Sequence, residues 1–120
     1  MKKILIIEDD KILQKALNEA LSEAGFKIIL ASDGDEGIQK AKSEKPDLIL
    51  LDIILPGKNG YNVLLAFSDD DSLKNIPVIM LTVIDSEFSV ETCKEAGVKD
   101  YLVKSDYSLD EVIKKINKYI

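Results

Sequence analysis

The strongest constraint on the fold is a regular alternation between short apolar runs and segments with helical spacing. The apolar run Lys3–Ile7 is followed by apolar residues at helical intervals from Ile12 to Ala24, and the same change of pattern recurs along the chain. Continuous apolar runs are typical of parallel strands that are covered on both faces. We therefore predict an α/β fold with five βα units, a (βα)5 doubly wound parallel sheet.

The pattern also predicts where each element lies and how some of them end. Strands are expected at Lys3–Ile7, Phe26–Ala31, Asp47–Leu51, Pro77–Thr82 and Lys99–Val103. Helices are expected at Ile12–Ala24, Gly34–Glu44, Tyr61–Phe67, Ser86–Ala96 and Ser108–Ile120. Gly25 and Gly97 are typical C-terminal stops, and Ser108 with Glu111 has the spacing of a capping box. The 120 residues are expected to form one domain.

Composition excludes several kinds of chemistry. The chain has no His and a single Cys. It therefore cannot form a histidine-based metal site, a histidine general base or an internal disulfide. The net charge of −6 disfavours direct binding to nucleic acid. No apolar run approaches the length of a membrane span or signal peptide, so we expect a cytoplasmic protein without membrane insertion.

Polar side chains follow four of the five predicted strands at the point where each strand ends. Glu8 and Asp9 follow the first strand, Asp52 follows the third, Thr82 ends the fourth and Lys104 follows the fifth. The carboxyl ends of parallel strands meet at one edge of the sheet, where ligands of doubly wound folds bind. We expect these side chains to form one site.

Asp52 is the most informative of these residues because apolar residues flank it on both sides. Near Glu8 and Asp9 it would be repelled, by about 4 kcal/mol for charges about 4 Å apart at an effective dielectric near 20. A hard cation bound by oxygen atoms, together with Lys104, would offset this repulsion. The sequence therefore predicts a Mg²⁺ site beside Asp52.

The chain resembles a response-regulator receiver domain of two-component signalling over essentially its whole length. The segments that carry the resemblance are KILIIEDD (3–10), DGDEG (33–37), PDLILLDIILPGKNG (46–60), IPVIMLT (76–82) and GVKDYLVK (97–104). The resemblance implies a CheY-like, flavodoxin-like sheet with strand order 2-1-3-4-5. It also implies a single receiver domain over residues 1–120 with no output domain in this chain, acting as a signalling switch that catalyses only its own phosphorylation and dephosphorylation.

The resemblance assigns a role to each acidic residue of the predicted site. Asp52 matches the aspartate that accepts a phosphoryl group from the phosphohistidine of a kinase. Glu8, Asp9, Asp52 and the backbone carbonyl of Ile54 match the ligands of Mg²⁺, with Asp9 more direct and Glu8 acting through water. Asp10 is expected either to contribute to this cluster or to cap the following helix.

The remaining matches concern the phosphoryl group and the switch. Thr82 matches the hydroxyl that bonds the new phosphoryl group, and Lys104 matches the lysine that pairs with its oxygens. Tyr101 matches an aromatic residue that moves inward with Thr82, although it could also be a packed strand residue. The implied partners are a sensor histidine kinase or phosphotransfer protein and a downstream protein that contacts the fourth helix, fifth strand and fifth helix.

Three departures from the family pattern carry expectations of their own. Ser105 follows Lys104 where the family usually has a Pro in a cis bond, which leaves the isomer of this bond open. Val83 stands where a small residue is common and would narrow access to the phosphoryl group. Ile54 and Ile84 flank the site and cannot orient a water molecule, so we hypothesise slow autodephosphorylation.

Other functions and other readings of single residues stay open at this point. A haloacid-dehalogenase-type phosphatase would need an aspartate where Ile54 stands. A fold-only interaction module and a flavodoxin-like cofactor binder are further alternatives, and the acidic cluster disfavours a flavin phosphate. The segment Asp69–Asp71 is expected to be a solvated loop and Cys93 a core residue. The poor apolar stripe of the fourth helix favours a marginal or movable helix.

Overall fold

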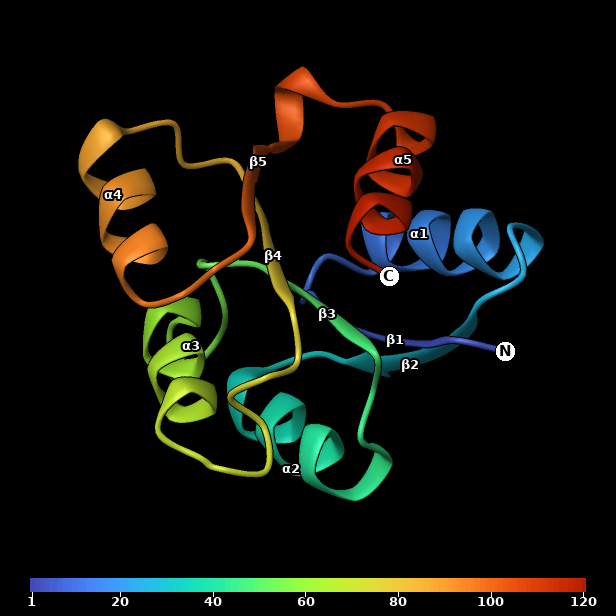
Figure 1. Ribbon diagram of the computed structural model, residues 1–120. Helices are drawn as coiled ribbons and strands as arrows, with labels where there is room; N and C mark the ends of the chain where they lie inside the picture. The colour runs from blue at the N-terminus through green and yellow to red at the C-terminus, as the bar shows by residue number, and fades with distance from the viewer.

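The computed structural model describes residues 1–120 and has one sheet of five parallel strands in the order β2-β1-β3-β4-β5 (Figure 1). The strands are β1 (Lys3–Ile7), β2 (Lys27–Ala31), β3 (Leu48–Leu51), β4 (Val78–Thr82) and β5 (Asp100–Val103). The helices are α1 (Lys11–Glu23), α2 (Gly34–Glu44), α3 (Gly60–Ser68), α4 (Glu87–Glu95) and α5 (Leu109–Tyr119). The predicted (βα)5 fold and its strand order are confirmed.

The element bounds differ from the predicted ones by at most one residue at each end, mostly because capping residues lie just outside the helices. The Asp10 carboxylate accepts hydrogen bonds from the backbone N–H groups of Ile12 and Leu13, so it caps α1. Ser108 and Glu111 form the predicted capping box of α5. One element was missed, the 3-10 turn η1 (Lys104–Asp106) directly after β5.

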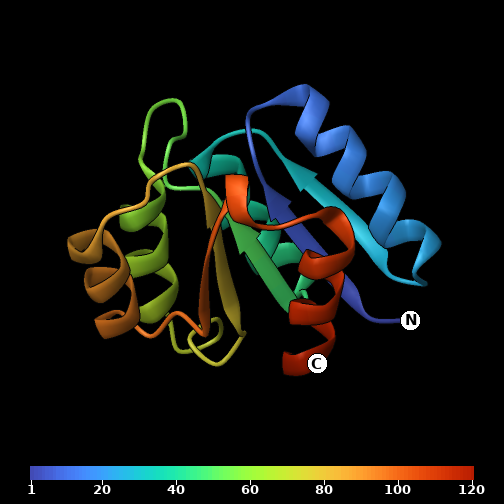
Figure 2. The ribbon, with the colours of Figure 1, turned by 90° about the horizontal axis from the view of Figure 1, so that it is seen from above.

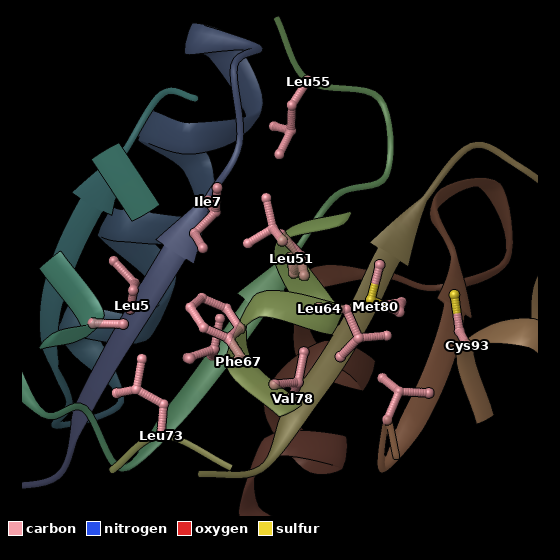
Figure 3. Close-up of a cluster of buried hydrophobic side chains, with 14 of the residues drawn as sticks. Leu5, Ile7, Leu51, Leu55, Leu64, Phe67, Leu73, Val78, Met80 and Cys93 are labelled. Carbon is pink, nitrogen blue, oxygen red and sulfur yellow. The ribbon is translucent and has the colours of Figure 1, made fainter. Parts of the chain in front are cut away.

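The sheet separates two layers of helices and therefore two hydrophobic clusters. Helices α1 and α5 cover one face, and α2, α3 and α4 cover the other (Figure 2). Successive side chains of a strand point to opposite faces, so Ile4 and Ile6 belong to one cluster while Leu5 and Ile7 belong to the other. Figure 3 shows the cluster that contains Leu5 and Ile7. Both faces of the central strands are thus buried, as their continuous apolar sequence predicts.

The register of the central strands brings two distant chain segments together. Ile7 at the end of β1 pairs with Leu51 at the end of β3. The backbone N–H of Asp52 donates to the carbonyl of Ile7 at 3.1 Å, which holds the residues after the two strands side by side. The helices that follow β1 and β3 cover opposite faces of the sheet. Doubly wound folds bind ligands at such a switch point between neighbouring strands.

Helix α4 is the most lightly packed helix of the fold. Cys93 is its only buried residue, which confirms the expected core position of this cysteine. Phe88, in the first turn of α4, is 80% exposed. None of the helices has the length and apolar character needed to cross a membrane.

Candidate functional site

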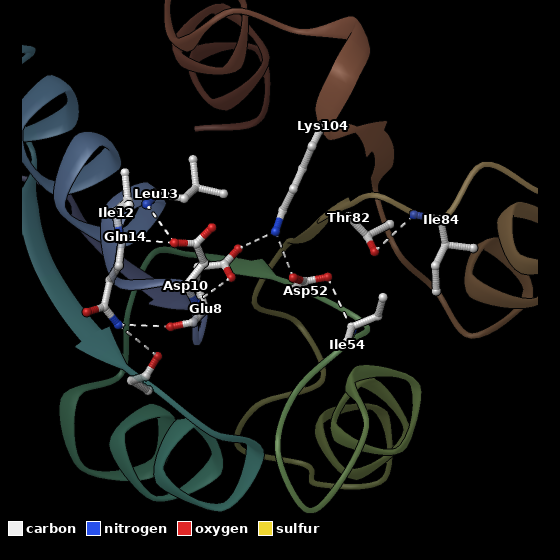
Figure 4. A network of polar contacts seen from close by, with 11 residues as sticks. Glu8, Asp10, Ile12, Leu13, Gln14, Asp52, Ile54, Thr82, Ile84 and Lys104 are labelled. Atoms are coloured by element: carbon white, nitrogen blue, oxygen red, sulfur yellow. Dashed lines mark hydrogen bonds and ion pairs between the residues drawn. The ribbon is translucent and has the colours of Figure 1, made fainter.

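The structure brings the three predicted acidic ligands together at the carboxyl edge of the sheet. Figure 4 shows two of them, Glu8 and Asp52, with Lys104 between them. Each of Glu8, Asp9 and Asp52 offers a carboxylate oxygen, and the three oxygens lie within 4.8 Å of one another. Glu8 and Asp52 are 2% and 5% exposed, whereas Asp9 is open to solvent. The cluster therefore combines two buried carboxylates with one that faces water.

Lys104 joins the two buried carboxylates. Its Nζ lies 2.8 Å from Glu8 Oε1 and 2.8 Å from Asp52 Oδ2, although the residues come from three different strand ends. Burial acts to lower the pKa of Lys104, but the hydrogen bonds to Asp52 and Glu8 outweigh it and the pKa is raised. Lys104 is therefore held as a cation between two carboxylates.

Glu8 is more deeply enclosed than its predicted role suggested. Its Oε2 accepts a hydrogen bond from the backbone N–H of Asp10 at 3.0 Å, and its Oε1 contacts Lys104. Burial raises the pKa of Glu8, while the hydrogen bonds to Lys104 and Asp10 act in the opposite direction. The hydrogen bonds to Lys104 and Asp10 thus favour the charged form of Glu8, which burial alone disfavours.

Gln14 is a supporting residue that the sequence analysis missed. Its side chain is buried in α1, and Nε2 donates to the carbonyl of Glu8 at 3.0 Å and lies 3.3 Å from the carbonyl of Ala31. These bonds tie the acidic loop to the end of β2. A signal was present, because Gln14 shares the helical stripe of the buried Leu17 and Leu21.

The loop after β3 places Asp52 through close backbone packing. Oδ1 of Asp52 accepts from the backbone N–H of Ile54 at 3.2 Å, and the N–H of Gly60 donates to the carbonyl of Ile53 at 2.7 Å. A Cβ atom on Gly60 would overlap the backbone carbonyl of Asp52. Gly60 therefore lets α3 begin directly against the acidic site, which the sequence alone did not reveal.

Thr82 and Tyr101 lie on the β4 and β5 side of the site. Thr82 is fully buried, and its Oγ1 accepts from the backbone N–H of Ile84 at 3.4 Å. Tyr101 is also buried, and its hydroxyl donates to the carbonyl of Ile84 and contacts Ser89 Oγ, each at 2.8 Å. Burial raises the pKa of Tyr101, and the hydrogen bond to Ser89 opposes this. Tyr101 therefore connects the loop after β4 to α4.

The departures from the family pattern also have visible consequences. The Lys104–Ser105 peptide bond is trans, and the chain continues into the η1 turn. The side chains of Ile54 and Val83 are 53% and 60% exposed. Both side chains are apolar and cannot form hydrogen bonds with water.

The acidic cluster fits a hard divalent cation. Its donors are carboxylate oxygens, which Mg²⁺ prefers, and the solvent-facing Asp9 leaves space for the water molecules that Mg²⁺ retains. The cluster also has no nitrogen or sulfur ligand of the kind that zinc sites use. The fit rests on these donors.

The fold and site define a doubly wound α/β protein with an acidic, cation-compatible centre at the switch point of its sheet. Residues 4–117 match the response regulator receiver domain family, and the chain belongs to this family. The predicted resemblance is confirmed.

Individual relatives agree with this assignment. The chain is 39% identical to the alkaline phosphatase synthesis transcriptional regulatory protein PhoP of Bacillus subtilis, over 86% of this chain and 42% of PhoP. It is 36% identical to the protein PilH of Pseudomonas aeruginosa, over 87% of this chain and 86% of PilH. The chain thus spans less than half the length of PhoP and most of the length of PilH.

A solved structure of a receiver domain has the same fold as this chain. The receiver domain of sensor histidine kinase PA1611 from Pseudomonas aeruginosa, solved with a magnesium ion coordinated in its active site cleft, superposes with a TM-score of 0.88 at 27% identity. The match covers 98% of this chain and 96% of that one. Response regulators are signalling switches of two-component systems that interact with histidine kinases and downstream targets, and a role as phosphoaspartate acceptor is consistent with the family.

Proposed function

We propose that this receiver accepts a phosphoryl group on Asp52 from the phosphohistidine of a partner kinase in a Mg²⁺-dependent reaction. The observation that carries the proposal is the contact of Lys104 Nζ with both Glu8 and Asp52 at 2.8 Å, beside a third carboxylate on Asp9. An ammonium group at this place supports charge on an aspartate that gains a phosphoryl group. An exposed ion pair such as Lys74 with Asp71 does not place one ammonium group between two buried carboxylates.

The transfer forms one bond and breaks another. An oxygen of Asp52 attacks phosphorus as the nucleophile, the bond between phosphorus and the donor imidazole nitrogen breaks, and the imidazole leaves with the bonding electron pair. Lys104 and the Thr82 hydroxyl are the groups that would contact the phosphoryl oxygens. The chain has no His, so it can receive a phosphoryl group from a phosphohistidine but cannot offer one.

Glu8, Asp9, Asp52 and the backbone carbonyl of Ile54 would hold Mg²⁺. When bound, the ion supplies positive charge that stabilises the phosphoryl oxygens during transfer. Lys104 then faces fewer uncompensated carboxylates and is available to pair with the phosphoryl group. The Asp9 carboxylate is the acidic group that solvent reaches first, so it is the natural point of entry for the cation.

We infer that phosphorylation is read out through Thr82 and Tyr101. A phosphoryl group on Asp52 would draw the Thr82 hydroxyl toward it, and the inward Tyr101 would then be favoured. Since the Tyr101 hydroxyl contacts Ile84 and Ser89, the inward state fixes the loop after β4 against α4. The switched surface would comprise α4, β5 and α5, and it would act on a downstream protein in the cytoplasm.

Residues 1–120 are proposed to act as a single receiver unit that carries the acceptor, the metal ligands and the switch. The fold supports this, since one sheet and two helical layers bring all of these groups to one edge. The unit would catalyse its own phosphorylation and dephosphorylation, with no other substrate.

Intact mass after incubation with acetyl phosphate tests the proposal. We expect a gain of one phosphate in wild type with Mg²⁺, no gain without Mg²⁺, and no gain in Asp52→Ala. Asp71→Ala is a matched control that removes an exposed carboxylate and should react as wild type does. An adduct that forms equally in Asp52→Ala would overturn the assignment of the acceptor.

A further inference from the structure

Helices α3 and α4 are neighbours on one face of the sheet (Figure 2). A cleft lies between them. This cleft of about 550 Å³, here called the α3–α4 groove, is lined by Ile53 and Tyr61 on one side and by Ile84, Phe88 and Cys93 on the other. A cleft of this size exceeds the volume of a single side chain and lies within the range of ligand sites. It is separate from the acidic cluster.

The groove combines a mostly apolar lining with one unusually exposed aromatic side chain. Phe88 is 80% exposed, and the adjoining helix α3 has no charged residue. Large exposed aromatic side chains at the edge of an apolar cleft are typical of interaction sites. The rest of the surface is rich in charge, since 32% of the residues are charged.

The outer edge of the groove is acidic. Glu87, Glu91 and Glu95 are exposed and recur every fourth residue, so they form one stripe along α4. Phe88 and Thr92 form the neighbouring stripe that lines the groove. A partner that places an apolar side chain in the groove therefore meets a row of carboxylates beside it.

We propose that the α3–α4 groove binds an amphipathic helix of a partner protein, with a large apolar side chain in the groove and Lys or Arg residues against the Glu87–Glu91–Glu95 stripe. Charge complementarity selects this occupant, because the stripe attracts basic residues and α3 contributes no opposing charge. A second copy of this chain is a poorer occupant, because each copy carries a net charge of −6.

Occupancy of the groove would be coupled to the acceptor site, and this coupling rests on the proposed function. Both partners of the Tyr101 hydroxyl, Ile84 and Ser89, line the groove. A change in the position of Tyr101 would therefore alter two of the groove residues. Coupling of this kind is reciprocal, so a groove ligand that favours the inward Tyr101 would also favour phosphorylation.

Amide chemical shifts of the ¹⁵N-labelled chain test the binding. The probe is a synthetic helical peptide with a leucine and phenylalanine stripe flanked by lysines, and its matched control carries glutamates in place of the lysines. We expect saturable shifts centred on α3 and α4 with the lysine peptide. No saturable binding at millimolar peptide, equal binding of the glutamate peptide, or shifts centred elsewhere would each overturn the proposal.

Two variants locate the contact. Phe88→Ser and the double change Glu87→Lys with Glu91→Lys should each lower the affinity for the lysine peptide at least tenfold. These positions are exposed, so folding is preserved. Ile12→Ser and Glu19→Lys remove an equally exposed apolar side chain and an exposed carboxylate on α1, and they should bind as wild type does. Unchanged binding by the groove variants contradicts the proposal.

The same titration with acetyl phosphate and Mg²⁺ separates the two proposals. We expect the peptide affinity to rise at least threefold in wild type and to stay constant in Asp52→Ala. An adduct that forms without any change in affinity overturns the coupling. If no adduct forms, the proposed function fails, while binding to the unmodified chain still decides the groove.

Discussion

At the scale of single residues, the site depends on one cation placed between buried anions. Lys104 is 18% exposed as a side chain, and its two partners, Glu8 and Asp52, are 3% and 5% exposed. Removing one member of such a group leaves buried charge without compensation, which costs more than the intact arrangement contributes. Lys104 should therefore matter both for stability and for phosphoryl transfer.

Lys104→Met should lower the free energy of unfolding by about 2 kcal/mol in the absence of divalent cations, because Glu8 and Asp52 lose their counter-charge. Millimolar Mg²⁺ should restore more stability to the variant than to wild type, since it can compensate the same carboxylates. Urea unfolding with and without Mg²⁺ measures both effects. Lys115→Met, which removes a lysine from a surface pair with Asp100, is the matched control. Equal losses in both variants would argue against a special role for Lys104.

Ile54 should govern how long the phosphoryl group persists. Its apolar side chain stands exposed beside Asp52 and cannot orient an attacking water molecule. We predict that Ile54→Asn shortens the lifetime of the phosphorylated protein several-fold, because an amide can hydrogen-bond water. The decay of the phosphate adduct by intact mass is the measurement. A lifetime equal to or longer than that of wild type would refute the hypothesis of slow autodephosphorylation.

At the scale of elements, sequence patterns predicted the fold well because each helix or strand has a signal within its own few residues. Continuous apolar strands, helical stripes, and caps such as Asp10 and Ser108 act within a few residues. The helical stripe of α1 indicates that Gln14 is buried, but neither the bonding partners of Gln14 nor the role of Gly60 could be predicted in the same way. Both depend on contacts that exist only after α1 and α3 have packed against the strand ends.

Gly60→Ala should lower stability by about 3 kcal/mol, because the new methyl group would push α3 away from the Asp52 carbonyl. The displacement should also slow adduct formation, since Asp52 moves with its backbone. Gly25→Ala is a useful comparison, because that position has open space but a positive φ of 98°. It should cost a comparable amount of stability, about 1–3 kcal/mol of backbone strain, but leave adduct formation unchanged. Equal adduct rates in both variants would contradict the packing argument.

The capping box of α5 should make part of the stability dependent on pH. The hydrogen bond that the backbone N–H of Ser108 donates to the Glu111 carboxylate is the main cause of the lowered pKa of Glu111. A lowered folded-state pKa gives stability that is present above the unfolded-state value and lost as pH falls through the folded-state value. Glu111→Gln should therefore differ from wild type at pH 7 and approach it in acid, as pH falls through the lowered pKa of Glu111. Urea unfolding at a series of pH values measures this, and a constant difference would contradict it.

At the scale of the whole molecule, the sheet order explains why four separated segments form one site. The predictions for Glu8, Asp9, Asp52 and Lys104 were possible because parallel strands share one carboxyl edge. The contact between Tyr101 and Ser89 was not predictable, since it depends on the angle at which the lightly packed α4 lies against β5. The residues at the strand ends could therefore be predicted from the sequence, whereas the connection of the site to α4 could not.

Mg²⁺ should stabilise the whole fold. Binding to the native acidic cluster alone adds RT ln(1 + [Mg²⁺]/Kd), or about 2.7 kcal/mol at a concentration one hundred times Kd. Asp9→Asn should remove most of this gain, because Asp9 is one of the three clustered carboxylates. The midpoint of thermal unfolding at increasing MgCl₂ concentration measures this stabilisation, with KCl at matched ionic strength as the control for screening. Identical midpoints in MgCl₂ and KCl would speak against a metal site.

The most direct test of the account is to identify the phosphorylated residue chemically. Borohydride reduces an aspartyl phosphate to homoserine, so peptide mass spectrometry after treatment with acetyl phosphate, Mg²⁺ and borohydride marks the acceptor. We predict homoserine at position 52, with no modification at Glu8 or Asp9 and none when Mg²⁺ is omitted. Reduction at Glu8 or Asp9, or an intact Asp52 in a sample that carries phosphate, would contradict it.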